Sequence, residues 1–282
     1  MSEGQVWFIT GAGSGMGVAF AKAALAAGYE VAATGRNPDA VAKAVGVTDD
    51  LLVTRLDVTS PDDAEIAANA AVERFGRIDV LINNAGSSFK GFFEEMTPAQ
   101  VERQLATNLL GPMNVTRAVL PVMRRQRSGH VISISSGAGL VAFQYSSAYA
   151  ASKFGLEGWM AALDQEIAPF GIHTTIVNPG WFRTDLIRME PDLWPQVSVD
   201  DYGERSATQR AWWENQNGKQ SGDPAKLARA LLAIAGQESP LRRFIAGNDA
   251  IALAEQKIAD LRAQIDYSRG LSTSFAFDVD ER

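Results

Sequence analysis

The chain has 282 residues, of which 46% are hydrophobic and 21% charged, and its formal net charge is −7. This length is enough for one large α/β domain with a well-buried core, and the negative charge excludes a general nucleic-acid surface. The sequence contains no cysteine, which excludes disulfide bonds and thiolate metal ligands and fits a reducing compartment.

Targeting and metal-binding signals are also missing from the sequence. The first residues run directly into a strand pattern, and no apolar run approaches the roughly 18 residues of a membrane span, so neither a signal peptide nor a membrane helix is expected. We therefore expect a cytoplasmic protein with neither a membrane nor a nucleic-acid partner. His130 and His173 each stand at the start of a strand pattern, where structural roles are expected, and we expect no metal site.

Strand and helix patterns alternate along the chain. Apolar runs predict strands at residues 6–10, 30–34, 51–58, 79–83, 130–135, 172–177 and 243–246. Helices are predicted at residues 18–27, 38–45, 61–75, 97–120 with an interruption near Gly111 and Pro112, 147–168, 224–235 and 250–265. This alternation indicates right-handed βαβ units. We expect an α/β fold: a doubly wound Rossmann-type parallel sheet of about seven strands, with helices on both faces, in a single domain over residues 1–282.

The residues that suggest function follow the predicted strands. In such sheets ligands bind beyond the carboxyl ends of the strands. The candidates, in chain order, are the glycine loop after the first strand, Arg36 after the second, Asp57 at the end of the third, the NNAG sequence at 83–86 after the fourth, Ser136 after the fifth and Pro179–Gly180 after the sixth. Their common position at one edge of the sheet predicts a single ligand site.

The glycine loop reads TGAGSGMG and fits the pattern T-G-x-x-x-G-x-G through Thr10, Gly11, Gly15 and Gly17. It does not fit G-x-G-x-x-G in any register. Glycine permits a tight turn and a close approach of the backbone, and the following helix offers free N–H groups to a pyrophosphate. A purely structural turn is the alternative, and the position between a strand and a helix favours phosphate binding.

The end of the second strand bears on which dinucleotide is bound. A fold that prefers NAD usually has an acid about twenty residues past the glycines, bonded to the ribose 2′-hydroxyl. No acid stands at Thr34 or Gly35, and Arg36 follows. A guanidinium suits a 2′-phosphate, which predicts NADP(H). The alternative is a solvated loop arginine.

A tyrosine and a lysine stand four residues apart in the sequence YAASK. On a helix this spacing places Tyr149 and Lys153 on one face. A nearby ammonium favours the phenolate and lowers the pKa of a tyrosine, which predicts a general acid/base. Ser136 adds a hydroxyl at the end of the fifth strand. A surface pair on an amphipathic helix is the alternative.

Taken together, these motifs resemble the short-chain dehydrogenase/reductase family. The resemblance covers about the first 190 residues closely and adds the sequence LDV at 56–58, Asn108 and the sequence NPG at 178–180. It implies an NAD(P)-dependent oxidoreductase in which Tyr149 is the acid/base and Lys153 lowers its pKa and holds the nicotinamide ribose. Ser136 would orient the carbonyl, and Asn108 would hold a water in a proton relay. Epimerases or dehydratases of the extended branch and a non-catalytic dinucleotide sensor are alternatives that the motifs disfavour.

The resemblance also implies a set of cofactor-binding residues. Asp57 would contact adenine, and Ser14 is neutral where some members of the family place a second base. The expected set is Thr10, Gly11, Ser14, Gly15, Met16, Gly17, Arg36, Asp57, Val58, Asn84, Ala85, Gly86, Tyr149, Lys153, Pro179, Gly180, Trp181 and Thr184.

The substrate region is expected in residues 181–222, a long aromatic segment typical of active-site lids. The pocket candidates are apolar and lack partners for a sugar or a phosphate: Ala138, Val141, Phe143, Trp181, Phe182, Leu186 and Met189. They predict a hydrophobic or aromatic ketone, aldehyde or secondary alcohol as the substrate. A ketoacyl thioester, a steroid and a quinone are the alternatives.

Residues 250–265 form an amphipathic pattern with Ile251, Ala254, Ile258, Leu261 and Ile265 on one side. This extension, within a C-terminal helix and tail at about 248–282, loosely resembles the branch that contains hydroxysteroid dehydrogenases. The resemblance implies a homodimer or homotetramer, with the helices at 97–120 and 147–168 pairing with their copies. The expected apolar contacts are Leu105, Leu109, Leu156, Trp159, Met160 and Leu163.

Overall fold

The computed structural model describes residues 4–184, 186, 191–271 and 275. Its centre is a parallel sheet of seven strands in the order β3-β2-β1-β4-β5-β6-β7. The strands are β1 (Val6–Ile9), β2 (Glu30–Gly35), β3 (Leu51–Arg55), β4 (Val80–Asn83), β5 (Gly129–Ile134), β6 (Ile172–Pro179) and β7 (Arg243–Ala246). The predicted α/β fold and its seventh strand are confirmed.

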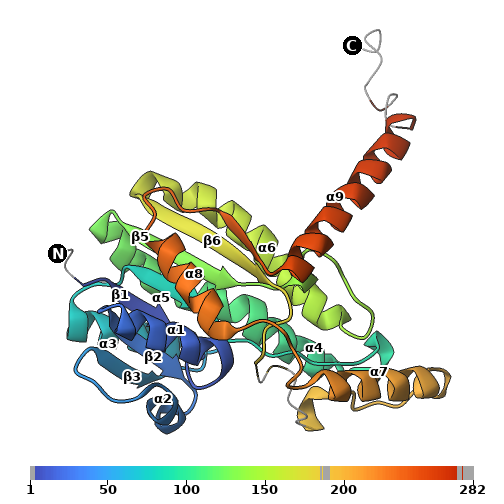
Figure 1. Ribbon diagram of the computed structural model, residues 1–282, viewed down its shortest axis with the longest axis horizontal. Coiled ribbons are helices and arrows are strands. Elements are labelled where there is room, and N and C mark those ends of the chain that lie inside the picture. The colour runs from blue at the N-terminus through green and yellow to red at the C-terminus, as the bar shows by residue number, and fades with distance from the viewer. Residues whose placement is uncertain (1–3, 185, 187–190, 272–274, 276–282) are drawn as a thin grey trace.

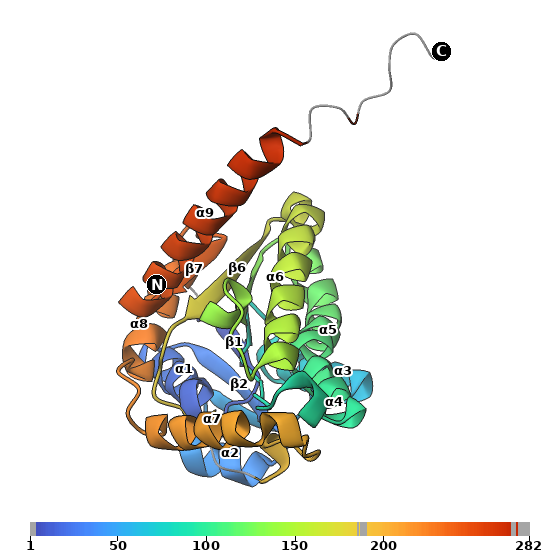
Figure 2. The ribbon, with the colours of Figure 1, turned by 90° about the vertical axis from the view of Figure 1, so that its right-hand side faces the viewer.

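Helices cover both faces of this sheet, as Figure 1 and Figure 2 show. One face packs against α3 (Pro61–Phe75), α5 (Gly111–Gln126) and α6 (Ser147–Ile167), which form one hydrophobic cluster with the strands. The other face packs against α1 (Gly15–Ala26), α2 (Pro38–Val45) and α8 (Pro224–Ala235), which form a second cluster. Each helix presents an apolar side to the sheet, so the core is a layer on each face.

The strand order reverses beside β1, which lies between β2 and β4. The chain leaves β1 and β4 toward opposite faces of the sheet, so the carboxyl ends of these strands open a crevice between the two connections. The functional candidates of the first four strands all stand at this edge.

The predicted interruption of the helix at 97–120 is a π-helical turn. It separates α4 (Pro98–Leu105) from α5 and spans Ala106–Leu110. Pro112 has no N–H to donate to the carbonyl of Asn108 one turn earlier, which favours a local change in hydrogen bonding. Such π turns often occur at functional positions, and this one carries Asn108.

The segment that the sequence predicts to be a lid, residues 181–222, contains α7 (Gly203–Gln216), and backbone hydrogen bonds join its two ends. The Arg183 N–H donates to the carbonyl of Gly222 at 2.9 Å, and the Gly222 N–H donates to the carbonyl of Trp181 at 2.7 Å. Because its two ends are joined, the described part of this segment, with α7, lies at the carboxyl edge of the sheet. Figure 1 shows α7 lying beside α4 at that edge.

The last helix, α9 (Asn248–Arg269), extends away from the sheet, as both ribbon views show. Its apolar stripe is exposed: Ile251 is 43% exposed, Ile258 67%, Leu261 43% and Ile265 50%. Within the described part of the chain, no helix has the length and apolar character needed to cross a membrane.

The expected dimer contacts on α6 are partly wrong. Leu156, Met160 and Leu163 are buried in the chain's own core, where they pack against α3, α5 and the sheet. These side chains are therefore not available to a partner. The outer side of the same region instead exposes Leu110 and Phe154.

Candidate active site

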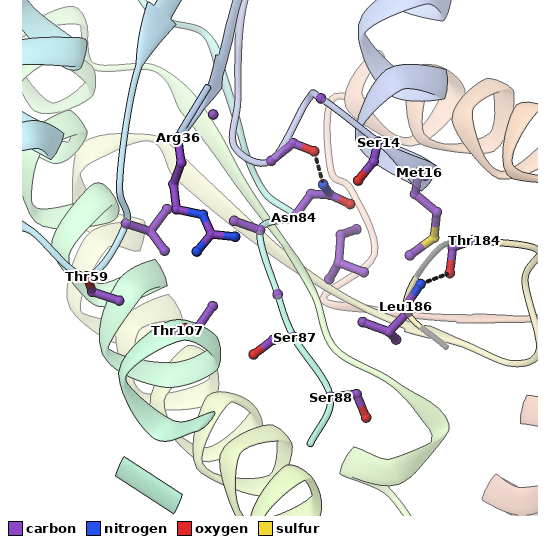
Figure 3. A pocket seen from close by; sticks show the side chains of 18 of the residues that line it. Ser14, Met16, Arg36, Thr59, Asn84, Ser87, Ser88, Thr107, Thr184 and Leu186 are labelled. Carbon is purple, nitrogen blue, oxygen red and sulfur yellow. Dashed lines mark hydrogen bonds between the residues drawn. The ribbon is translucent and has the colours of Figure 1, made fainter. Parts of the chain in front are cut away.

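A cavity of about 830 Å³ runs along the carboxyl ends of the central strands. Figure 3 shows its walls, with Arg36 reaching into it from the end of β2 and Ser14 and Met16 bordering it at the glycine loop. Most of the predicted cofactor residues line it: Gly11, Ser14, Gly15, Met16, Arg36, Asp57, Val58, Asn84, Ala85, Gly86, Tyr149, Lys153 and Thr184. The sequence motifs thus meet in one cavity.

The glycine loop leaves room for a phosphate at the start of α1. Ser14 precedes this helix, makes no side-chain cap, and no acid stands in the first turn, so the helix presents free N–H groups and the positive end of its dipole to the cavity. Gly11 has a φ of 66°, which favours glycine. A Cβ on Gly17 would lie 2.3 Å from the carbonyl oxygen of Gly11, so this glycine allows the close turn. These features fit a dinucleotide pyrophosphate.

Thr10 and Asn84 join the start of the glycine loop to the segment that follows β4. The N–H groups of Asn84 and Ala85 donate to the Thr10 hydroxyl at 2.9 and 3.0 Å. The Asn84 side-chain amide donates to the carbonyls of Thr10 and Gly11 at 2.9 and 3.2 Å. Thr10 and Gly17 therefore shape the cavity from behind its wall rather than line it.

At the other end of the cavity, Arg36 lies near the carboxylate of Asp57. Burial alone would raise the pKa of Asp57, but hydrogen bonds from Thr59 and the charges of Arg36 and Arg55 lower it below its usual value. The Thr59 N–H and hydroxyl donate to Asp57 at 3.0 and 2.7 Å. Asp57 is thus held as an anionic acceptor, while Arg36 is exposed to the cavity and offers a donor fork.

Tyr149 and Ser136 meet near the centre of the sheet edge. Tyr149 is 8% exposed, and its hydroxyl lies close enough to the Ser136 side chain for that side chain to lower the pKa of the tyrosine. The Ser136 hydroxyl also accepts from the N–H of Ala138 at 3.1 Å. Asn178 donates to the carbonyl of Ser136 at 3.0 Å and to Glu157 at 2.6 Å, which fixes the turn that carries the serine.

Lys153 is buried on the same helix face, and its ammonium donates to the carbonyl of Ile134 at 2.8 Å. Its Nζ lies 5.7 Å from the centre of the Tyr149 ring. Burial lowers the pKa of Lys153 to about 8, although the nearby Glu157 raises it. Tyr149 and Lys153 therefore lie on the same face of α6, as their spacing predicts.

The sequence predicted a lowered pKa for Tyr149, and in the structure the direction is the opposite. Burial raises the pKa of Tyr149 above its usual value, and the hydrogen bond from Ser136 only partly offsets this. The reason is desolvation, which spacing along a helix cannot reveal. A tyrosine in this environment holds its proton at neutral pH and is ready to act as a general acid.

Asn108 is 1% exposed, and its side chain is fully engaged. Its Oδ1 accepts from the Ser87 N–H at 2.9 Å, and its Nδ2 donates to the Ser87 carbonyl at 2.9 Å and to Ser152 at 3.2 Å. The side chain thus holds the loop after β4 against α6. The water relay implied for this residue stays a prediction.

The segment after β6 is attached to the start of α9. The Trp181 N–H donates to the Asp249 carboxylate at 2.6 Å, and the Gly180 N–H donates to the carbonyl of Ala246 at 2.9 Å. A Cβ on Gly180 would lie 2.1 Å from this carboxylate, so a larger residue would require the Asp249 side chain to move. Pro179, Gly180 and Trp181 do not line the cavity wall.

The substrate residues expected from sequence are only partly at the cavity. Leu186 lines it, whereas Ala138, Val141, Phe143 and Phe182 do not, and Met189 lies outside the described residues. Phe143 is 45% exposed, and Phe182 packs on the second core cluster. Trp181 instead contacts Trp212 edge to face and Trp213 at a tilted angle, with ring-centre distances of 5.7 and 5.6 Å.

Several residues on the cavity wall were missed by sequence reasoning. They come from the loop after β4, from α4 with its π turn, and from the lid: Ser87, Ser88, Phe89, Arg103, Thr107, Asp192 and Leu193. Close by, Lys90 is 5% exposed, with its Nζ 5.9 Å from the centre of the Tyr149 ring. The sequence signal for Lys90 was its position soon after the NNAG motif, at the sheet edge where the other candidate residues lie.

The sequence and the fold are similar to those of several known proteins. A family model described as short chain dehydrogenase matches residues 5–192. Oxidoreductase BOA17 of Botryotinia fuckeliana is 35% identical over 277 residues, which cover 96% of this chain and 99% of that protein. A short-chain dehydrogenase structure from Streptomyces avermitilis is 35% identical with a TM-score of 0.86, covering 98% of this chain and 100% of that chain.

A second solved structure shares the fold at lower identity. The short chain dehydrogenase/reductase from Burkholderia phymatum, in complex with NAD, is 22% identical with a TM-score of 0.81, covering 93% of this chain and 95% of that chain. The full-length match to an oxidoreductase, the family model and the shared architecture lead to one conclusion. The chain belongs to the short-chain dehydrogenase/reductase family, whose members are oxidoreductases that bind a nicotinamide dinucleotide.

Proposed function

We propose that this protein is an NADP(H)-dependent carbonyl reductase or alcohol dehydrogenase with Tyr149 as its acid/base. The observation that carries the proposal is the close approach of Ser136 and Tyr149, with Lys153 beside them, at a cavity whose far end holds Arg36. Arg36 is exposed to that cavity and is placed to pair with a 2′-phosphate. No acid competes for the same role at Thr34 or Gly35.

The residues of this site are suited to carbonyl reduction. A bound nicotinamide dinucleotide would supply the hydride, which carries two electrons to the carbonyl carbon. The hydroxyls of Ser136 and Tyr149 would donate to the carbonyl oxygen, where negative charge develops. Tyr149 would then give its proton to that oxygen and so complete the alcohol. In the reverse direction the same tyrosine would accept the proton.

The protein offers a mainly apolar lid to the substrate. Trp181, Trp212 and Trp213 contact one another in edge-to-face and tilted pairs, and Leu186 and Leu193 line the cavity. Such surface rewards burial of apolar substrate area at roughly 25 cal/mol per Å². The proposal is therefore a hydrophobic or aromatic ketone, aldehyde or secondary alcohol.

We also propose that the protein works as a homo-oligomer in the cytoplasm. The exposed stripe of α9 follows a heptad spacing through Ile251, Ala254, Ile258, Leu261 and Ile265, which is typical of paired helices. We take a second copy, packed antiparallel, as its partner. In that arrangement the two charges that flank the stripe, Glu255 and Arg262, face their opposites on the other copy.

The decisive experiment follows NADPH consumption with an aryl alkyl ketone, a small sugar and an acetoacetyl thioester. We expect the ketone to have the highest kcat/KM. A tenfold preference for the sugar or the thioester, about 1.4 kcal/mol of transition-state binding, would reject the apolar-substrate proposal. NADH in place of NADPH tests the cofactor in the same assay.

A further inference from the structure

Lys90 stands at a junction of three segments around the reactive tyrosine. Its N–H donates to the carbonyl of Leu193 in the lid at 2.8 Å, and the next N–H, of Gly91, donates to the carbonyl of Tyr145 at 3.0 Å. The residues before it are held by Gln104, whose side chain accepts from the Phe89 N–H at 2.8 Å and donates to the Ser87 carbonyl at 2.9 Å. The backbone that carries Lys90 is therefore fixed from both sides.

The amino group of Lys90 is buried with few acceptors. Its Nζ lies 4.2 Å from the centre of the Trp213 ring and 5.9 Å from that of Tyr149. Its hydrogen bonds go to the hydroxyl of Ser88 and, at 3.4 Å, to the carbonyl of the same residue. Among the described residues no carboxylate forms an ion pair with it. A buried lysine is rarely left in this way, because an ammonium has three donors to satisfy.

The surroundings of this amine are short of acceptors and adjoin the cavity that contains Tyr149. The Trp213 indole N–H is also buried, and the described residues offer it no hydrogen-bond acceptor. Ser88, which contacts the amine, lines the same cavity as Tyr149, so Lys90 lies one residue behind the cavity wall. An acceptor that enters beside Tyr149 would thus meet an unneutralised cation next to aromatic rings.

We propose that Lys90 is a specificity-determining residue that binds a carboxylate on the substrate, and that the preferred substrate is an oxo acid or hydroxy acid with an apolar body. This inference rests on the proposed reductase function and narrows its substrate class. The apolar body packs against the lid tryptophans, and the carboxylate reaches the amine within a few bonds of the reacting carbon. Lys90 takes no part in the transfer of hydride or proton.

The physical argument is the cost of desolvation. Burial lowers the pKa of Lys90 to about 7, so its charged form lacks compensation in the free protein. An incoming carboxylate compensates that charge in a site of low dielectric, where a hydrogen-bonded ion pair is strong. A neutral ester of the same shape carries no negative charge, so the charge of the Lys90 amine stays uncompensated. The site therefore discriminates between acid and ester.

The test uses three aryl oxo acids whose carboxylate lies progressively farther from the carbonyl: benzoylformate, benzoylacetate and 3-benzoylpropionate, each with its methyl ester. We expect at least one acid to exceed its ester tenfold or more in kcat/KM. Lys90→Met should remove that preference and change kcat/KM for the esters less than threefold. Lys43→Met removes an exposed lysine elsewhere and is the matched control, which should change neither.

A binding measurement separates this inference from the reductase proposal. Calorimetric titration of phenylacetate into the protein saturated with NADP⁺ reports carboxylate binding without turnover, and Lys90→Met should weaken it tenfold or more. If each ester has a kcat/KM equal to that of its acid, the role of Lys90 is rejected while the reductase proposal stands. The same holds if Lys90→Met leaves phenylacetate binding unchanged. If phenylacetate binds through Lys90 but no carbonyl is reduced, the reductase proposal fails instead. Lys90→Gln, which keeps a donor without the charge, replaces the methionine variant if that variant does not fold.

Discussion

At the scale of single residues, Tyr149 is the residue on which the proposed acid/base chemistry depends. Tyr149→Phe keeps the packed ring and removes the proton, so we expect kcat for ketone reduction to fall by about 10²- to 10⁴-fold, the usual contribution of a positioned acid. Binding of NADPH, followed by fluorescence titration, should stay within a factor of two. A variant that kept a tenth or more of wild-type kcat would remove Tyr149 from the mechanism.

Arg36 should set the choice of cofactor. Arg36→Ala removes the guanidinium at the cavity, and a charge-assisted bond to a phosphate is worth about 1.5–3 kcal/mol. We expect KM for NADPH to rise more than tenfold while KM for NADH changes little. Arg55→Ala is the control, because Arg55 also acts on Asp57 but does not line the cavity. An equal rise for both cofactors would mean that Arg36 only supports the loop.

The buried lysines should make stability depend on pH. Burial lowers the pKa of Lys90 to about 7 and that of Lys153 to about 8, from a usual value of 10.5. At a pH between the lowered pKa of each lysine and 10.5, the unfolded chain binds a proton that the folded chain does not. The free energy of unfolding therefore rises as pH rises through this range. Each group contributes up to about 1.4 kcal/mol per pH unit within its window. Denaturant unfolding at pH 7 and pH 9 should show a smaller rise for Lys90→Met than for the native chain, and equal rises would contradict the assigned direction.

At the scale of elements, the lid should couple binding to turnover. Trp212 contacts Trp181 and Trp213 at ring-centre distances of 5.7 and 5.1 Å, and each such pair is worth about 0.5–1.5 kcal/mol. Trp212→Ala should therefore loosen α7, raise KM for the ketone and lower kcat together. Steady-state kinetics measure both constants, and Tyr267→Ala on α9 serves as an exposed aromatic control. A change confined to thermal stability would show that α7 does not act as a lid.

At the scale of the whole molecule, α9 should hold copies of the chain together. Ile258→Glu with Leu261→Glu places like charges in the apolar stripe, and light scattering at micromolar concentration should show a lower mass than for the native protein. Ala263→Glu lies on another side of the helix and should leave the mass unchanged. A native protein that is already monomeric would refute the pairing, and an unchanged mass in the double variant would move the interface elsewhere, such as to the exposed Leu110 and Phe154.

The sequence by itself determined the architecture and pointed to Ser136, Tyr149 and Lys153 as the residues of the proposed catalytic site. Strand runs, proline-led helix starts and the glycine loop depend on local backbone chemistry, and the spacing of Tyr149 and Lys153 depends on the helix repeat. These signals need no knowledge of distant contacts. They predicted the seven parallel strands, the break near Pro112 and the helix face on which Tyr149 and Lys153 lie.

Only the tertiary structure decided what surrounds these groups. It buries Leu156 and Met160 in the core rather than on the surface, raises the pKa of Tyr149 by desolvation, and brings Lys90 beside that tyrosine. The physical reason is that burial and low dielectric arise where segments far apart in the chain pack together. A periodic pattern shows that a helix has an apolar face, but the elements that cover this face are set by the packing of the whole sheet.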